Sequence, residues 1–238
     1  MKIIRNQSIE DLAQARLIEF QRATGWEPVP PVPIDLVAER ILGLDFLWDS
    51  IDEMPGETIL GGLKAKDRLI VLNEKHRDLF EMKPGLERST KGHEMGHWDL
   101  FIDKLALDHP NLFGGDDSPF SLRSTPDGEV EVIKQLESTP EGRETLAAIR
   151  ARADEPDEAR AVNRYAAALS MPPALLRAEA QKVDRTVWRN LYRLAERFDV
   201  TISAMVVRLQ QMDLLFVGAG RKLYASRDAA SGQGTFRF

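Results

Sequence analysis

Two histidines and a glutamate lie close together in the segment His93-Glu94-Met95-Gly96-His97. A helix turns by about 100° per residue, so side chains four positions apart project from the same face. His93 and His97 can therefore direct two imidazole nitrogens at one metal ion. Glu94 does not need to bind the metal, because it can accept a proton from a metal-bound water and pass it to a leaving amine. These residue types at this spacing predict zinc-dependent hydrolysis of peptide bonds.

The flanking residues predict the helix that this motif requires. Apolar side chains recur at helical spacing from Leu86 to about Leu107, so the motif lies inside a helix. Gly96 costs a helix interior about 1 kcal/mol relative to alanine, and close packing near a metal would justify that cost. A chance arrangement on a surface helix is the competing interpretation. It is disfavoured because the chain has only 4 histidines, and the motif uses two of them.

A catalytic zinc ion usually takes three protein ligands and leaves one position for water, so one further ligand is needed. A third histidine at the metzincin position is excluded, because Asp103 stands there. His76 and His109 are predicted to be surface residues. With no cysteine in the chain, the remaining strong ligands are carboxylates, and the acidic stretch 154–158 supplies them.

Within this stretch Glu158 is the first candidate for the third ligand, with Glu155 and Asp157 behind it. A structural interpretation competes with this one. Pro156 suits the first turn of a helix, and an acidic residue in that turn stabilises the helix through its dipole or a capping box. Both interpretations of Glu158 stay open at this point.

The composition is that of an ordinary globular protein, with 43% hydrophobic and 29% charged residues, which disfavours disordered and fibrous classes. No apolar run reaches the roughly 18 residues that span a bilayer, and residues 1–8 lack the apolar core of a signal peptide. We therefore expect a cytoplasmic protein that does not enter a membrane. The net charge of −6 argues against broad attraction to nucleic acid.

The patterns predict an α+β fold that is mostly helical and carries a small antiparallel sheet. Strands are expected at Leu44 to Trp48, Thr58 to Leu63, Arg68 to Asn73 and Leu214 to Val217. Besides the helix of the motif, helices are expected from Ser8 to Gly25, Ile34 to Gly43, Pro156 to Met171, Leu175 to Lys182, Val187 to Phe198 and Ile202 to Met212. Residues 108–128 are expected to form a loop. We assign residues 1–182 to one domain and residues 183–238 to a helical region with a C-terminal tail.

Four segments appear in an order that is similar to that of a known family: the helix Ile34 to Gly43, the strand end Ile70 to Asn73, the segment Arg88 to His97, and Asn163 to Pro172. Through them the chain resembles the ImmA/IrrE-type metallopeptidases, bacterial and phage zinc proteins that cleave repressors. The resemblance covers approximately residues 32–215. It implies a zincin-like domain in which His93 and His97 bind zinc and Glu94 is the base.

The resemblance also implies a glutamate ligand about six residues before the aromatic residue of the last segment. That position is Ala159 in this chain, and Glu158 lies seven residues before Tyr165.

Residues 187–215 are similar to the helix-turn-helix-like region that follows the protease domain in this family. A helix that reads DNA needs exposed polar or basic side chains. The second helix of this region offers mainly Arg208, Gln210 and Gln211. We therefore expect this region to pack against the protease domain or recruit the substrate, and direct DNA binding is disfavoured.

Together, the motif and the resemblance predict a site-specific zinc endopeptidase whose protein substrate is a partner transcriptional repressor of the helix-turn-helix class. The alternative is a non-catalytic regulator, such as an antitoxin or a DNA-associated protein, with a structural or vestigial metal site. Zinc content separates the two hypotheses. The sequence leaves the oligomeric state open.

Overall fold

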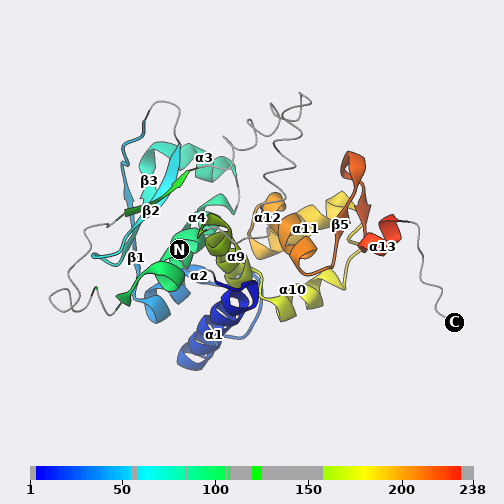
Figure 1. Cartoon of the computed structure of the whole chain (residues 1–238), viewed down its shortest axis with the longest axis horizontal. Coiled ribbons are helices and arrows are strands. Elements are labelled where there is room, and N and C mark those ends of the chain that lie inside the picture. Colours follow the sequence, from blue (N-terminus) through cyan, green and yellow to red (C-terminus); the bar gives the residue numbers. More distant parts are fainter. Residues whose placement is uncertain are drawn as a thin grey trace.

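The computed structural model describes residues 4–54, 58–83, 85–104, 107, 120–124 and 158–231, with 120–124 described by backbone alone. The fold is α+β and mostly helical with a small sheet, as predicted. The sheet lies at one end of the view in Figure 1 and the last helices lie at the other. None of the helices in these ranges is long and apolar enough to cross a membrane.

The first helices end where the glycines predict. Helix α1 (Asn6–Thr24) ends at Gly25, whose φ is 71°. Helix α2 (Ile34–Val37) continues into a π-helical turn, η1 (Ala38–Leu42), which ends at Gly43 with a φ of 66°. This left-handed backbone is favourable for glycine, so both predicted helix ends are confirmed.

Three strands confirm the predicted positions: β1 (Asp45–Asp49), β2 (Ile59–Lys64) and β3 (Leu69–Asn73). The prediction of a purely antiparallel sheet is wrong. The strand order is β1-β3-β2-β4, with β1 parallel to β3 and β2 antiparallel to both neighbours. Apolar patterns indicate where a strand lies but not its direction. Strand β1 pairs with β3 and not with β2, the next strand in the sequence.

The other edge strand, β4 (Phe120–Ser124), lies in the stretch that the sequence assigned to a loop. That assignment is wrong for these residues. Strand β4 forms because β2 supplies the backbone hydrogen bonds of the pairing. The composition of the short segment does not indicate this partner.

Two long helices form the centre of the molecule. After η2 (Glu74–His76) and α3 (Arg77–Met82), helix α4 (Leu86–Phe101) packs against the sheet, and α9 (Glu158–Ser170) packs against both α4 and α1. Helix α4 ends before the predicted Leu107, because the backbone turns extended at Ile102. Helix α9 confirms the predicted helix from Glu158 onward, and the predicted start at Pro156 lies outside the described residues.

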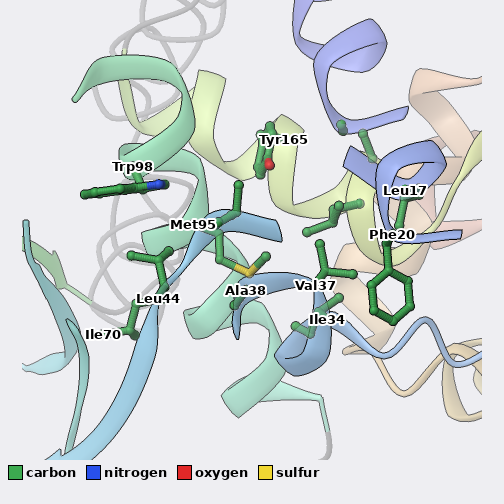
Figure 2. Packing of buried hydrophobic residues seen from close by; sticks show 14 of the residues in the cluster. Leu17, Phe20, Ile34, Val37, Ala38, Leu44, Ile70, Met95, Trp98 and Tyr165 are labelled. Atoms are coloured by element: carbon green, nitrogen blue, oxygen red, sulfur yellow. The ribbon is translucent and has the colours of Figure 1, made fainter. Parts of the chain in front are cut away.

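The main core holds these elements together. Figure 2 shows Leu17 and Phe20 of α1 facing the same interior as Met95 and Trp98 of α4 and Tyr165 of α9, and all of these side chains are buried. Burial of such side chains contributes about 1.5–3 kcal/mol each. The apolar face of α4 is therefore fixed, which fixes the direction of its remaining side chains.

A second core lies at the other end of the chain. Its elements are α10 (Pro173–Ala180), α11 (Trp188–Phe198), α12 (Ile202–Gln211), β5 (Phe216–Val217), η4 (Ala219–Arg221), β6 (Leu223–Tyr224) and α13 (Arg227–Ala230). The three predicted helices are confirmed. This core includes Met171, Leu176 and Ala180, so it begins before residue 183. The proposed division at residues 182 and 183 stays a prediction.

Arg208 of α12 points inward. Its side chain is fully buried, and its two terminal nitrogens donate to the Glu10 carboxylate of α1 at 2.6 and 2.7 Å. Its Nε donates to the carbonyl oxygen of Met171 at 3.2 Å. Of the three residues that this helix offered for DNA contact, Arg208 is therefore bound within the protein, while Gln210 and Gln211 are exposed.

Candidate metal centre

The two motif histidines face each other on α4. The Nε2 atoms of His93 and His97 lie 3.2 Å apart, and their rings meet edge to face with centroids 4.9 Å apart. The two residues are 6% and 7% exposed, so the pair is almost shielded from water. The predicted projection of both imidazoles from one face of a helix is confirmed.

Each ring is held at its other nitrogen by a residue of α9. Nδ1 of His93 lies 2.9 Å from Oδ1 of Asn163, and Nδ1 of His97 lies 3.0 Å from Oε1 of Glu158. An oxygen acceptor at this distance requires the nitrogen to donate, so the proton of a neutral ring sits on Nδ1. Both Nε2 atoms then present lone pairs to each other.

This arrangement fits a metal ion. Zinc lies about 2.0–2.1 Å from imidazole nitrogen, so two nitrogens of a tetrahedral site are separated by about 3.3 Å. The observed distance of 3.2 Å between the Nε2 atoms agrees with that value. Two lone pairs this close repel each other, and a cation bound by both removes the repulsion. The chemistry of the donors therefore suits zinc.

Glu94 follows His93 on the same helix and is fully buried. A carboxylate in a site from which bulk water is excluded interacts more strongly with neighbouring charges than one at the surface. Its position beside the first histidine matches the spacing from which a general base was predicted.

Two glycines of α4 bring α9 close enough for these contacts. A Cβ on Gly96 would lie 2.9 Å from Cβ and 3.0 Å from Cα of Val162, and a Cβ on Gly92 would lie 3.1 Å from Cβ of Ala166. The close packing predicted for Gly96 is confirmed. The paired positions also show that α4 and α9 run in opposite directions, since the later glycine meets the earlier residue of α9.

The environment keeps His97 neutral. Burial lowers the pKa of His97 below its ordinary value, and the neighbouring Glu158 carboxylate opposes that shift only in part. A neutral imidazole is the form that binds a metal ion. The ring is therefore held in the protonation state that the site requires.

Glu158 is the first residue of α9, and about half of its side chain is exposed. Its carboxylate contacts Nδ1 of His97, on the opposite ring edge from the Nε2 pair. Ligation by Glu158 stays a prediction, and it requires the carboxylate to turn towards that pair. The other candidates, Glu155 and Asp157, lie outside the described residues.

Within the described ranges, no group of three or more His, Asp or Glu side chains is arranged to hold a metal ion. His76 does not join the site, because its Nε2 lies 2.5 Å from a Glu53 carboxylate oxygen and the side chain is partly exposed. His109 lies outside the described residues.

Asn163 is the site residue to which the sequence gave no role. Its contact with His93 depends on the antiparallel packing of α9 against α4, so no local pattern of the sequence marked it.

Asp99 anchors the end of α4 behind the histidines. Its fully buried carboxylate accepts two hydrogen bonds from Arg16 and one from Lys104, all at 2.8 Å, and one from Tyr165 at 3.0 Å. Burial raises the pKa of Asp99, but the hydrogen bonds from Arg16 and Lys104 outweigh that effect and hold it below its ordinary value. This network fixes α4 against α1 and α9.

Comparisons with known proteins add little to this geometry. No protein-family model matches the chain, and no curated protein matches it. Among solved structures, the chain is similar to a Mycobacterium tuberculosis transcriptional regulator, with a TM-score of 0.41 and 15% sequence identity over 92% of this chain and 50% of that one. The chain thus spans half the length of that structure, and a likeness at this level says nothing of function.

Proposed function

We propose that this chain is a zinc-dependent endopeptidase with a zincin-like catalytic domain, similar to the ImmA/IrrE metallopeptidases. The observation that carries the proposal is the pair of Nε2 atoms 3.2 Å apart, each on a ring held at Nδ1 by a residue of α9. We further propose that it acts in the cytoplasm on a partner repressor of the helix-turn-helix class.

Different residues of the chain would bind the metal ion and transfer the proton. His93 and His97 hold the ion, and a carboxylate from the acidic stretch 154–158 completes the protein ligands. Bound zinc supplies Lewis acidity, which polarises a carbonyl group and lowers the pKa of a water to about 7. Glu94 takes the proton from the attacking water and returns it to the nitrogen of the leaving amine.

Narrow specificity follows from where such an enzyme would work, because general digestion of exposed loops would harm the cell. The second core offers a surface for recruiting the substrate. DNA contact by α12 is disfavoured because Arg208 is buried against Glu10. A single cut in one bound partner is the reaction that fits these features.

The test replaces Glu94 by glutamine. Glu94→Gln should retain one zinc ion per chain yet cleave the repressor at least about 10²-fold more slowly, because the base is lost while both histidines remain. Zinc is counted by elemental analysis, and cleavage is followed by mass spectrometry. His93→Ala and His97→Ala should lose zinc. Glu87→Gln, the same change on the same helix at a partly exposed carboxylate that pairs with Lys91, is the matched control.

Equal turnover by Glu94→Gln and the wild type would remove Glu94 from the reaction. Wild-type protein that holds no zinc, or holds it without cleaving any partner, would support the alternative of a non-catalytic regulator. The motive for this alternative is the third ligand, which the described residues do not identify.

A further inference from the structure

Asn163 meets the first histidine from outside the buried pair. It lies on α9 at an exposed position, whereas His93 is 6% exposed. The oxygen of its side-chain amide is 2.9 Å from Nδ1 of His93. The amide therefore reaches inward from the surface to one ring edge.

The amide decides which nitrogen of His93 carries the proton. A neutral imidazole has one N–H and one lone pair, and the hydrogen bond at one nitrogen determines the role of the other. An amide oxygen at Nδ1 favours the tautomer with Nδ1–H. The lone pair is then on Nε2, which faces Nε2 of His97 at 3.2 Å.

We propose that Asn163 is a positioning residue that holds His93 as the Nδ1–H tautomer and aims its Nε2 lone pair at the shared ion. This inference deepens the proposed function and rests on it for the effect on zinc affinity. The effect on the tautomer does not depend on zinc.

The two histidines are held unequally. His97 donates to a carboxylate, whereas His93 donates to a neutral amide. A carboxylate at the outer nitrogen makes the ring a more basic ligand than an amide does. Asn163 therefore fixes the orientation of its ring without adding a second negative charge to the outer side of the site.

The first experiment observes the imidazole nitrogens of the metal-free protein by ¹⁵N nuclear magnetic resonance. His93 should be the Nδ1–H tautomer in the wild type and a mixture containing Nε2–H in Asn163→Leu. Asn163→Asp keeps an oxygen acceptor and should restore the wild-type tautomer. Asn190→Leu makes the same change on α11, where the amide donates to a backbone oxygen, and should leave His93 unchanged.

The second experiment measures zinc retention against a chelator. Asn163→Leu should weaken zinc binding about 10–100-fold, and Asn163→Asp should bind at least as tightly as the wild type. Because position 163 is exposed, unfolding of the metal-free variants should match the wild type.

An unchanged His93 tautomer in folded Asn163→Leu would overturn the inference, and so would wild-type zinc affinity in that variant. If the tautomer changes as expected but the wild-type protein binds no zinc, the proposed function fails while the positioning role of Asn163 stands.

Discussion

In the α4–α9 pair two glycines let the helix backbones approach, whereas in the α11–α12 pair large apolar side chains fill the space between the helices. Gly96 lies against Val162 in the first pair. Leu194, Phe198 and Met205 belong to the core of the second. Both pairs are buried, but only the first has polar groups that meet across it at a site.

The difference shows what each pair can do. Close backbones let short side chains such as Asn163 reach an imidazole on the neighbouring helix. A thick apolar layer keeps polar groups outside, and the one buried cation on α12, Arg208, is used to join that helix to α1. The first pair brings polar side chains together at the candidate site, and the second forms an apolar core.

The largest effect is expected at the ion pair between Arg208 and Glu10, which joins α12 to α1. Arg208→Met should lower the free energy of unfolding by about 3 kcal/mol, because it removes one partner of a buried ion pair. The loss is limited by Arg164, which also contacts the Glu10 carboxylate at 3.0 Å. Urea denaturation measures it. Arg193→Met, an exposed change on α11, should stay within about 0.5 kcal/mol, and equal stability of both variants would show that the ion pair contributes nothing.

The next effect separates the two glycines of the first pair. Gly96→Ala should destabilise the protein by about 1–3 kcal/mol and weaken zinc binding, because the new methyl group meets the backbone of Val162. Gly92→Ala meets mainly the methyl group of Ala166, and a better helix propensity offsets that contact. Thermal unfolding of the two metal-free variants checks the order. A Gly96→Ala protein as stable as Gly92→Ala would contradict the close approach at Val162.

The smallest effect concerns Glu158. As an acceptor for His97 it can be replaced by glutamine, so Glu158→Gln should change zinc affinity only a few-fold and Glu158→Ala about 10–100-fold. As a metal ligand it cannot be replaced by glutamine, and zinc affinity should then fall by orders of magnitude in both variants. The contact of Glu158 with Nδ1 favours the first pattern, in which the third ligand would come from Glu155 or Asp157. Chelator competition distinguishes them, and full retention by both variants would move attention to Glu155 and Asp157.

Features of the fold with a local cause could be predicted from the sequence. Gly25 and Gly43 end helices because they adopt a left-handed backbone, and the spacing of His93 and His97 places both on one face. Gly96 indicated close packing before its partner was known. Each of these conclusions depends on residues within one or two helical turns.

Features that depend on residues far apart in the sequence could not be predicted from it. Arginine is a residue type usually found at the surface, and the burial of Arg208 depends on Glu10, 198 positions away. The direction of β1 depends on which neighbour it pairs with, and β4 depends on the free edge of β2. Asn163 has a role only because α9 lies antiparallel to α4, a relation that no local pattern records.

The Glu10–Arg208 pair also bears on the order in which the protein is made. Helix α1 leaves the ribosome early and α12 follows much later, so the carboxylate of Glu10 cannot meet Arg208 until residue 208 has been synthesised. A nascent chain that stops short of α12 holds α1 by its apolar side chains, by the ion pair of Arg16 with Asp99 and by the contact of Glu10 with Arg164. The final electrostatic environment of the first helix is therefore set late in translation.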